Sequence, residues 1–162
     1  MIKYVISSCS LLETIFLIDH SYVDGTGTGY LVPQTILLRR SNFLNLPSFN
    51  LSYKNFHNGN SLKKIHDATP FNKKSDFEDF PKIHIKENIY FHAKYTLRGE
   101  DSQKVKELFT PEIMSFLAKE KNISIDAKGN TLAYYRTAKR VKPKDIDSFL
   151  EEAKKIYYKF RD

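Results

Sequence analysis

Two β-rich stretches separated by a glycine-rich turn constrain the fold of this chain most strongly. Residues 13–23 read ETIFLIDHSYV and residues 30–40 read YLVPQTILLRR, and both are rich in the β-branched and aromatic side chains that favour strands. Between them, DGTGTG has glycine at alternate positions, which is typical of a hairpin turn. We therefore expect a long antiparallel hairpin over residues 13–40. Pro33 predicts that the second strand lies at an edge of the sheet or carries a bulge at this position, because proline has no N–H to donate.

The rest of the chain carries shorter patterns of two kinds. Helical spacing of apolar residues runs from Val105 to Leu117, and Thr110 and Pro111 restart the helix as its cap and its first residue. A strongly amphipathic helix is predicted over residues 146–160, where apolar residues recur at intervals of three and four. Alternating apolar residues predict strands over residues 47–53, 83–85, 91–97 and 123–127, and from Thr131 onward after a tight turn at residues 128–130.

Length and composition place these elements in one folded unit. The chain has 162 residues, 41% hydrophobic and 14% aromatic, so it can bury a core and is too apolar to be disordered. Residues 54–80 are polar and rich in turn-forming residues, and we predict a long loop there. The prediction is a single α+β domain over residues 1–162, with a mainly antiparallel sheet and helices on one face. A barrel like that of pleckstrin-homology domains is the alternative.

The N-terminal region does not have the pattern of a membrane span. In residues 2–18, Lys3, Glu13 and several hydroxyl side chains interrupt the apolar run, which falls short of the ~20 residues that a bilayer requires. Cys9 is the only cysteine, so no intrachain or intermolecular disulfide network is expected and a reducing compartment fits. We expect a cytoplasmic protein, with peripheral association with the inner membrane as a further possibility.

No ionisable side chains fall at a spacing that catalysis or metal binding requires. The five histidines form no HxxxH or HExxH motif, and His84 and His92 are expected to make ordinary hydrogen bonds. The three carboxylates within residues 76–79 lack the glycine and the later glutamate of a calcium loop. The turn at residues 24–29 is followed by a strand pattern, whereas a phosphate loop needs a helix. We predict no catalytic residue, no cofactor and no metal site.

The strongest electrostatic feature is a run of cations ahead of the C-terminal helix. The chain has 26 Lys+Arg against 19 Asp+Glu, a net charge of +7 that favours anionic partners. Residues 136–144, RTAKRVKPK, contain five cations and no acid. The predicted partner surface consists of Arg136, Lys139, Arg140, Lys142, Lys144, Lys155 and Lys159.

Three interpretations of this surface remain open. An anionic lipid surface or a protein is the first choice of partner. Nucleic acid is the runner-up, although the sequence contains no RNP, helix-turn-helix or KH signature. The third interpretation is a solvated strand end and helix face without a partner.

Several short stretches, in their order and spacing, resemble a family of uncharacterised bacterial proteins. Members of that family show a strand with a glycine-rich turn, an LP-x-F segment, an LRGED strand end, an LFTP helix and a final YR strand before an amphipathic helix. The corresponding stretches here are FLIDHSYVDGTGTG (16–29), QT (34–35), LNLPSFNL (44–51), YTLRGED (95–101), LFTPEI (108–113) and LAYYR (132–136).

The resemblance implies that the protein acts near a membrane, and it implies no particular activity. Members often carry membrane-spanning segments ahead of the soluble part, and this chain starts at the first strand, so the resemblance implies a soluble or stand-alone version. The family supplies no catalytic residues to carry over. We expect a non-enzymatic binding or interaction module acting near the bacterial inner membrane. An enzyme whose site is assembled from distant residues is a further alternative.

Overall fold

The two β-rich stretches form the predicted hairpin. The structure is a computed structural model that describes residues 8–9, 13–23, 31–54, 79–85 and 88–161. Strands β2 (Glu13–Val23) and β3 (Leu31–Ser41) each have 11 residues and pair antiparallel with a continuous register from Glu13–Ser41 to Val23–Leu31. The hairpin is therefore confirmed, while the glycine-rich turn at residues 24–29 lies outside the described residues.

Pro33 occupies this hairpin without a bulge. The N–H of Thr35 points away from β2 and donates to the carbonyl of Lys139 at 3.2 Å, and Pro33, two residues earlier, has its nitrogen on the same side. Strand β7 pairs with β3 only from Ile36 to Arg40, so no β7 residue lies opposite Pro33. The missing donor therefore costs no ladder hydrogen bond, although β3 is an inner strand of the sheet and not the expected edge.

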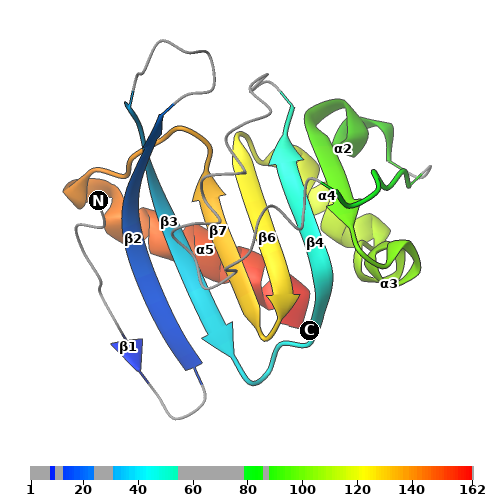
Figure 1. Ribbon diagram of the computed structural model, residues 1–162, viewed down its shortest axis with the longest axis horizontal. Coiled ribbons are helices and arrows are strands. Elements are labelled where there is room, and N and C mark those ends of the chain that lie inside the picture. Colours follow the sequence, from blue (N-terminus) through cyan, green and yellow to red (C-terminus); the bar gives the residue numbers. More distant parts are fainter. Residues whose placement is uncertain (1–7, 10–12, 24–30, 55–78, 86–87, 162) are drawn as a thin grey trace.

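All strands belong to one antiparallel sheet (Figure 1). Their order is β1-β2-β3-β7-β6-β4-β5, so the β6–β7 hairpin is inserted between β3 and β4. In the described residues β1 and β5 are the two edges and the sheet is open, so the barrel alternative is not adopted. The remaining strands are β1 (Ser8–Cys9), β4 (Leu46–Tyr53), β5 (Tyr95–Gly99), β6 (Ile123–Gly129) and β7 (Thr131–Arg136).

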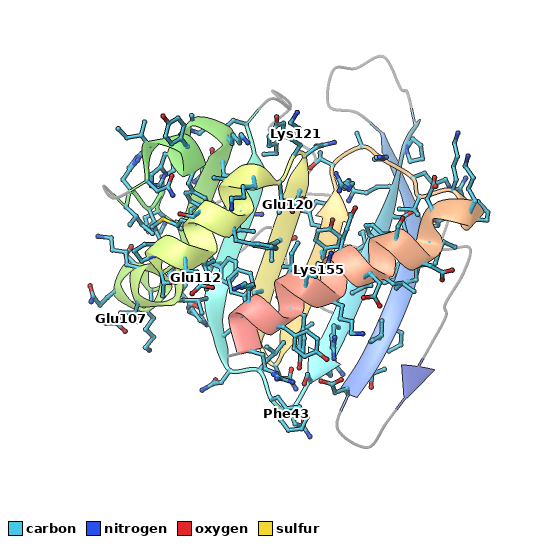
Figure 2. The ribbon with its side chains drawn as sticks, turned by 180° about the vertical axis from the view of Figure 1, so that it is seen from behind. Phe43, Glu107, Glu112, Glu120, Lys121 and Lys155 are labelled. Carbon is cyan, nitrogen blue, oxygen red and sulfur yellow. The ribbon has the colours of Figure 1, made fainter. Side chains whose placement is uncertain are left out.

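Helices cover one face of this sheet, as expected for an α+β fold. Helix α5 (Ile146–Arg161) crosses that face diagonally, and α4 (Pro111–Lys119) lies next to it (Figure 2). Helices α2 (Ile89–Lys94) and α3 (Ser102–Leu108) pack beside β4 and β5. A short 3-10 helix, η2 (Pro143–Asp145), leads into α5.

Side chains cap the starts of α3 and α4, and the cap of α4 is the one that the sequence predicts. The Asp101 carboxylate accepts hydrogen bonds from the N–H groups of Gln103 and Lys104, both at 3.1 Å. Thr110 Oγ1 accepts from the N–H of Ile113 at 3.3 Å, and Pro111 is the first residue of α4. Both side chains satisfy donors that a helix start leaves without intrahelical partners.

The strand predicted over residues 91–97 is wrong in its first half. Asn88 Oδ1 accepts the N–H of Phe91 at 2.9 Å and caps α2, so the strand begins only at Tyr95. Phe91 and Tyr95 are four residues apart, a spacing that also places them on one helical face, and their rings lie 5.5 Å apart. The exposed Ala93 breaks the alternation. Residues 83–85 form no strand either, although the N–H of Ile83 donates to Leu97 at 2.8 Å.

Aromatic side chains join the helices to the sheet. Phe109, at the junction of α3 and α4, lies edge-on to Phe49 of β4, with ring centroids 5.1 Å apart. It also contacts Phe91 of α2 at 5.9 Å and Phe160 of α5 at 5.6 Å. Because all four rings are buried in the main hydrophobic core, one cluster connects four elements.

Gly99 is required where β5 passes close to α3. A Cβ atom at this position would lie 2.7 Å from Val105 Cγ2 and 3.0 Å from Ile83 Cδ1. Both distances are shorter than normal carbon contacts, so a side chain here would push α3 away from the sheet. Gly99 ends the strand, as the sequence predicts.

The opposite face of the sheet carries a second, smaller cluster. Ile36, Leu38 and Tyr135 are buried there. Beside them, the buried Asp126 accepts hydrogen bonds from Asn50 Nδ2 at 2.6 Å and from the Tyr135 hydroxyl at 3.2 Å. The face of the sheet away from α5 therefore buries hydrogen-bonded polar side chains as well as apolar ones.

Candidate functional site

The predicted cationic stretch begins at the end of β7, and its first residue faces α5. Arg136 donates through Nη2 to Glu152 of α5 at 2.7 Å and through Nη1 to the carbonyl of Lys121 at 2.9 Å. Glu152 also accepts from the Tyr134 hydroxyl at 3.1 Å. Desolvation acts to lower the pKa of the Arg136 guanidinium, but the hydrogen bond and charge of Glu152 outweigh it and raise the pKa. Arg136 therefore ties α5 to the sheet.

Arg140 is also held by an acid. Its Nε donates at 2.8 Å to Asp19 of β2, whose other carboxylate oxygen accepts from Thr35 Oγ1 at 2.6 Å. Thr35 Oγ1 in turn accepts the N–H of Val141 at 2.9 Å. These contacts fasten the segment after β7 to the hairpin.

The three lysines of this segment are exposed. Lys139, Lys142 and Lys144 project from the connection between β7 and α5. The exposed Asp145 and Asp147 follow immediately and offset two of their charges. The local charge is therefore much smaller than the composition of residues 136–144 suggests.

Lys155 and Lys159 lie farther along α5, beside α4. Lys159 pairs with Glu112 of α4, and the exposed Lys155 borders the same depression between the two helices (Figure 2). Fifteen residues separate Lys144 from Lys159, about 22 Å along a helix. The predicted residues therefore occupy two separate regions, and three of the seven are in ion pairs.

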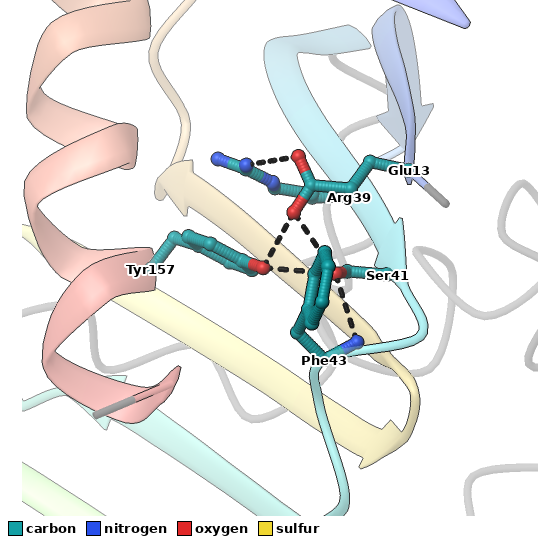
Figure 3. Close-up of polar contacts among 5 residues, drawn as sticks. All are labelled: Glu13, Arg39, Ser41, Phe43 and Tyr157. Carbon is teal, nitrogen blue, oxygen red and sulfur yellow. Dashed lines mark hydrogen bonds and ion pairs between the residues drawn. The ribbon is translucent and has the colours of Figure 1, made fainter. Parts of the chain in front are cut away.

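A polar cluster that sequence reasoning missed lies under the C-terminal half of α5 (Figure 3). Glu13 accepts from Arg39 Nη2 at 2.5 Å, from Ser41 Oγ at 3.0 Å and from the Tyr157 hydroxyl at 2.7 Å. The Ser41 and Tyr157 hydroxyls are 2.8 Å apart. The Arg39 guanidinium stacks on the Tyr157 ring, with Cζ 3.4 Å from its centroid.

These contacts set the ionisation of the cluster. Burial acts to raise the pKa of Glu13, but the hydrogen bonds from Tyr157, Arg39 and Ser41 outweigh it and lower the pKa. Burial, together with the bond to the Glu13 carboxylate, raises the pKa of Tyr157. The cluster thus contains an ionised carboxylate paired with a guanidinium, and its net charge is zero.

Part of this cluster could have been predicted from the sequence. In the predicted hairpin, Glu13 lies opposite the end of the second strand, and Arg39 and Ser41 share its face because side chains alternate. The contribution of Tyr157 depends on where α5 crosses the sheet, which no local pattern specifies.

The turn after this cluster carries an exposed aromatic ring. The N–H of Phe43 donates to Ser41 Oγ at 3.2 Å, and Leu44, which is buried, anchors the next position. The Phe43 side chain is 55% exposed and projects from the end of the sheet (Figure 2). The adjacent β6–β7 turn joins this one through the N–H of Ser41, which donates to the Asn130 carbonyl at 2.8 Å.

Two cations lie at the strand ends next to these turns, on the sheet face away from the helices. Arg40 pairs with Thr131, and Thr131 pairs with Lys128, so both cations lie in one row across β3, β7 and β6. Their Cα atoms are separated by two strand spacings, about 10 Å. Both side chains are exposed, and neither turn contains an acid.

The two histidines singled out in the sequence are neighbours in space. The rings of His84 and His92 lie 5.7 Å apart, and His92 Nε2 accepts the N–H of Ile85 at 2.9 Å. Burial is the main cause that lowers the pKa of His92, with the charges of His84 and Lys54 adding to it. The structural interpretation of these histidines fits this geometry.

Other candidates fall partly outside the described residues. Asp76, Glu78 and the glycine-rich turn are not described, and of Cys9 only the backbone is. Within the residues that are described, no three His, Cys, Asp or Glu side chains gather as metal ligands. No helix in that part of the chain is long and apolar enough to cross a bilayer.

Comparison with known proteins adds no identification to this geometry. No family model matches the chain, and no curated protein or solved structure is significantly similar to it.

Proposed function

We propose that this protein is a non-catalytic binding module that docks on an anionic membrane surface through the end of the sheet that carries Phe43. The single observation that carries the proposal is the exposure of Phe43 on a turn whose backbone is held in place. More than half of the Phe43 residue is in contact with water, so covering the ring with a second surface would be favourable through the hydrophobic effect. A membrane interface provides such a surface, and aromatic rings are favourable at the headgroup level.

The charges around Phe43 support the same partner. Arg40 and Lys128 lie in one row beside the turn, and both have aliphatic stems that can lie along apolar surface while the charge stays in water. Each cation near an anionic leaflet contributes about 1 kcal/mol. Two cations and one buried ring give a weak, reversible association that falls with salt.

The cationic stretch of residues 136–144 is the less favourable docking surface. Arg136 and Arg140 are held by Glu152 and Asp19, and two acids follow the exposed lysines. Docking through this stretch would require those ion pairs to break or the acids to approach an anionic surface.

Sedimentation with lipid vesicles tests the proposal. Wild-type protein is expected to pellet with vesicles containing phosphatidylserine or phosphatidylglycerol more than with pure phosphatidylcholine. Combining Arg40→Gln with Lys128→Gln should weaken binding by about 30-fold, because two interactions of about 1 kcal/mol are lost. Phe43→Ser should weaken binding to the same vesicles while leaving the fold intact.

Two matched controls separate this surface from the alternatives. Tyr90 is 80% exposed on α2, so Tyr90→Ser removes an exposed aromatic ring elsewhere and should leave binding unchanged. Lys142→Gln with Lys144→Gln removes two cations from the other region and should also leave binding unchanged. If this lysine pair is the one that weakens pelleting, the stretch of residues 136–144 is the docking surface. Equal pelleting with both vesicle types, or a low-salt gel shift with nucleic acid that depends on the same lysines, contradicts the proposal.

A further inference from the structure

We propose that the contact between His92 and Ile85 is a latch that opens when the imidazole of His92 binds a proton. His92 belongs to α2, and Ile85 ends the described segment of residues 79–85, which lies along the outer edge of β5. The latch involves neither the turn that carries Phe43 nor its cations, so it is independent of the function proposed above.

The hydrogen bond of the latch requires a neutral imidazole. The N–H of Ile85 donates to Nε2 of His92 at 2.9 Å, and a backbone N–H can only donate. The ring nitrogen Nε2 therefore has a free lone pair, and the proton of the neutral ring is on Nδ1. A second proton can bind only at Nε2. Two N–H groups would then face each other, so the hydrogen bond would be lost.

The charges around His92 oppose the bound proton. The His84 ring lies 5.7 Å from the His92 ring, so two protonated imidazoles would repel each other. Lys54, just after β4, donates to the His92 carbonyl and adds a positive charge. Glu107 is exposed and accepts a hydrogen bond from Gln103 on its own helix at 2.8 Å. Among the described residues, the charged and titratable groups around the latch are His84, Lys54, Lys94, Lys106 and Glu107.

The closed latch binds a proton less tightly than the open one. Burial lowers the pKa of His92 below its ordinary value of 6.5, and the charges of His84 and Lys54 lower it further. When the latch is open, the ring is in water and its pKa returns to the ordinary value. Protonation therefore favours the open form, increasingly as the pH falls from 6.5 to the lowered value. The latch is closed above pH 6.5 and opens in mildly acidic solution.

Neighbouring contacts confine the opening to the end of the segment. The N–H of Ile83 donates to the Leu97 carbonyl at 2.8 Å, and the N–H of Gly99 donates to the Pro81 carbonyl at 3.3 Å. Neither hydrogen bond includes a titratable group, so both persist when His92 is protonated. On the other side of the latch, the fully buried Phe91 anchors α2 in the core.

Opening of the latch moves one wall of a depression beside α3 and α4. This depression has a volume of about 470 Å³ and is lined by His84 and Ile85 on the side of the latch. The buried Phe109 and Met114 also line it. Because Ile85 is itself buried, its release exposes apolar surface at this place. Proton binding at His92 is thereby coupled to the size of the depression.

Amide hydrogen exchange followed by NMR between pH 7.5 and pH 5 tests the latch in wild-type protein. The measured quantity is the protection factor of Ile85 relative to that of Ile83, because this ratio cancels the intrinsic effect of pH on exchange. We expect the ratio to fall as His92 titrates, by tenfold for each unit that separates the measured pKa of His92 from 6.5. The methyl signal of Met114 should shift with the same midpoint.

Three results in wild-type protein would overturn the proposal. A ratio that stays constant through the titration of His92 would show that the hydrogen bond does not respond to the proton. Equal losses of protection at Ile83 and Ile85 would show that the whole segment opens. A Met114 signal that does not follow the titration would refute the link to the depression.

Two matched variants identify the titrating group. His92→Gln keeps an acceptor oxygen on α2 but does not titrate, so its ratio should not change with pH. His84→Gln is the control, and it should keep the transition with a raised midpoint, since one positive charge is removed. A pH-dependent ratio in folded His92→Gln, or no transition in folded His84→Gln, would assign the response to another group and refute the latch. The wild-type measurement decides the question if either variant fails to fold.

Discussion

Single side chains hold this protein together at points where sequence-distant segments meet. Glu13 and Tyr157 are 144 positions apart, yet their side chains share a hydrogen bond of 2.7 Å under α5. Arg39 would be a buried unpaired cation without Glu13, and such a charge is strongly unfavourable. The polar cluster therefore helps to fix the position of α5 on the hairpin.

Glu13→Gln is expected to change how stability depends on pH. The fold lowers the pKa of Glu13 below its ordinary value of 4.5, so its stabilisation is complete above that value and is lost as pH falls through the lower folded value. At pH 7 the variant should be less stable than wild type, because it loses the ion pair with Arg39. Between pH 5 and pH 3 wild type should lose more stability than the variant does.

Urea unfolding across this pH range measures the effect. Glu107→Gln, a surface substitution on α3, serves as the control and should follow the wild-type curve. A constant difference between wild type and Glu13→Gln from pH 7 to pH 3 would contradict the assigned role of the carboxylate.

Secondary structure follows local signals where capping residues and apolar periodicity agree. Thr110 and Pro111 place the start of α4, and the three-and-four spacing places α5, so both helices could be predicted. The first half of the strand predicted over residues 91–97 is wrong because Phe91 and Tyr95 fit both the strand period of two and the helical interval of four. Asn88 as a cap was the signal that decides between them.

Thr110→Ala should lower stability by about 1 kcal/mol, because the N–H of Ile113 loses its acceptor. Thr110→Ser keeps the hydroxyl and should retain most of the wild-type stability. Denaturant unfolding at neutral pH measures both variants. Equal losses for alanine and serine would show that the threonine methyl group, and not the cap, matters at this position.

Across the domain, the packing of helices on the sheet depends on contacts that no local pattern encodes. The sequence identified strands, helices and the α+β class, but not the order in which β6 and β7 enter between β3 and β4. The contribution of Tyr157 to the polar cluster depends on the path of α5 over the sheet, so it could not be predicted either. Phe109, which contacts rings from β4, α2 and α5, shows how these elements share one core.

Phe109→Ala is expected to destabilise the whole domain by about 3–5 kcal/mol, because it leaves a cavity at the centre of the aromatic cluster. Phe43→Ala removes the same side chain from an exposed turn and should change stability by at most about 0.5 kcal/mol. Unfolding followed by both circular dichroism and tyrosine fluorescence measures the two variants. A loss of less than 1 kcal/mol for Phe109→Ala would mean that the cluster does not couple the helices to the sheet.

The insertion of the β6–β7 hairpin between β3 and β4 has a consequence for synthesis on the ribosome. Until residues 123–136 emerge, the chain contains two ribbons, β2 with β3 and β4 with β5, that do not touch through backbone pairing. Isolated two-stranded ribbons are at best marginally stable in water. The nascent protein must therefore wait for its final quarter before the sheet is complete, and its inner strand edges stay open to chaperones until then.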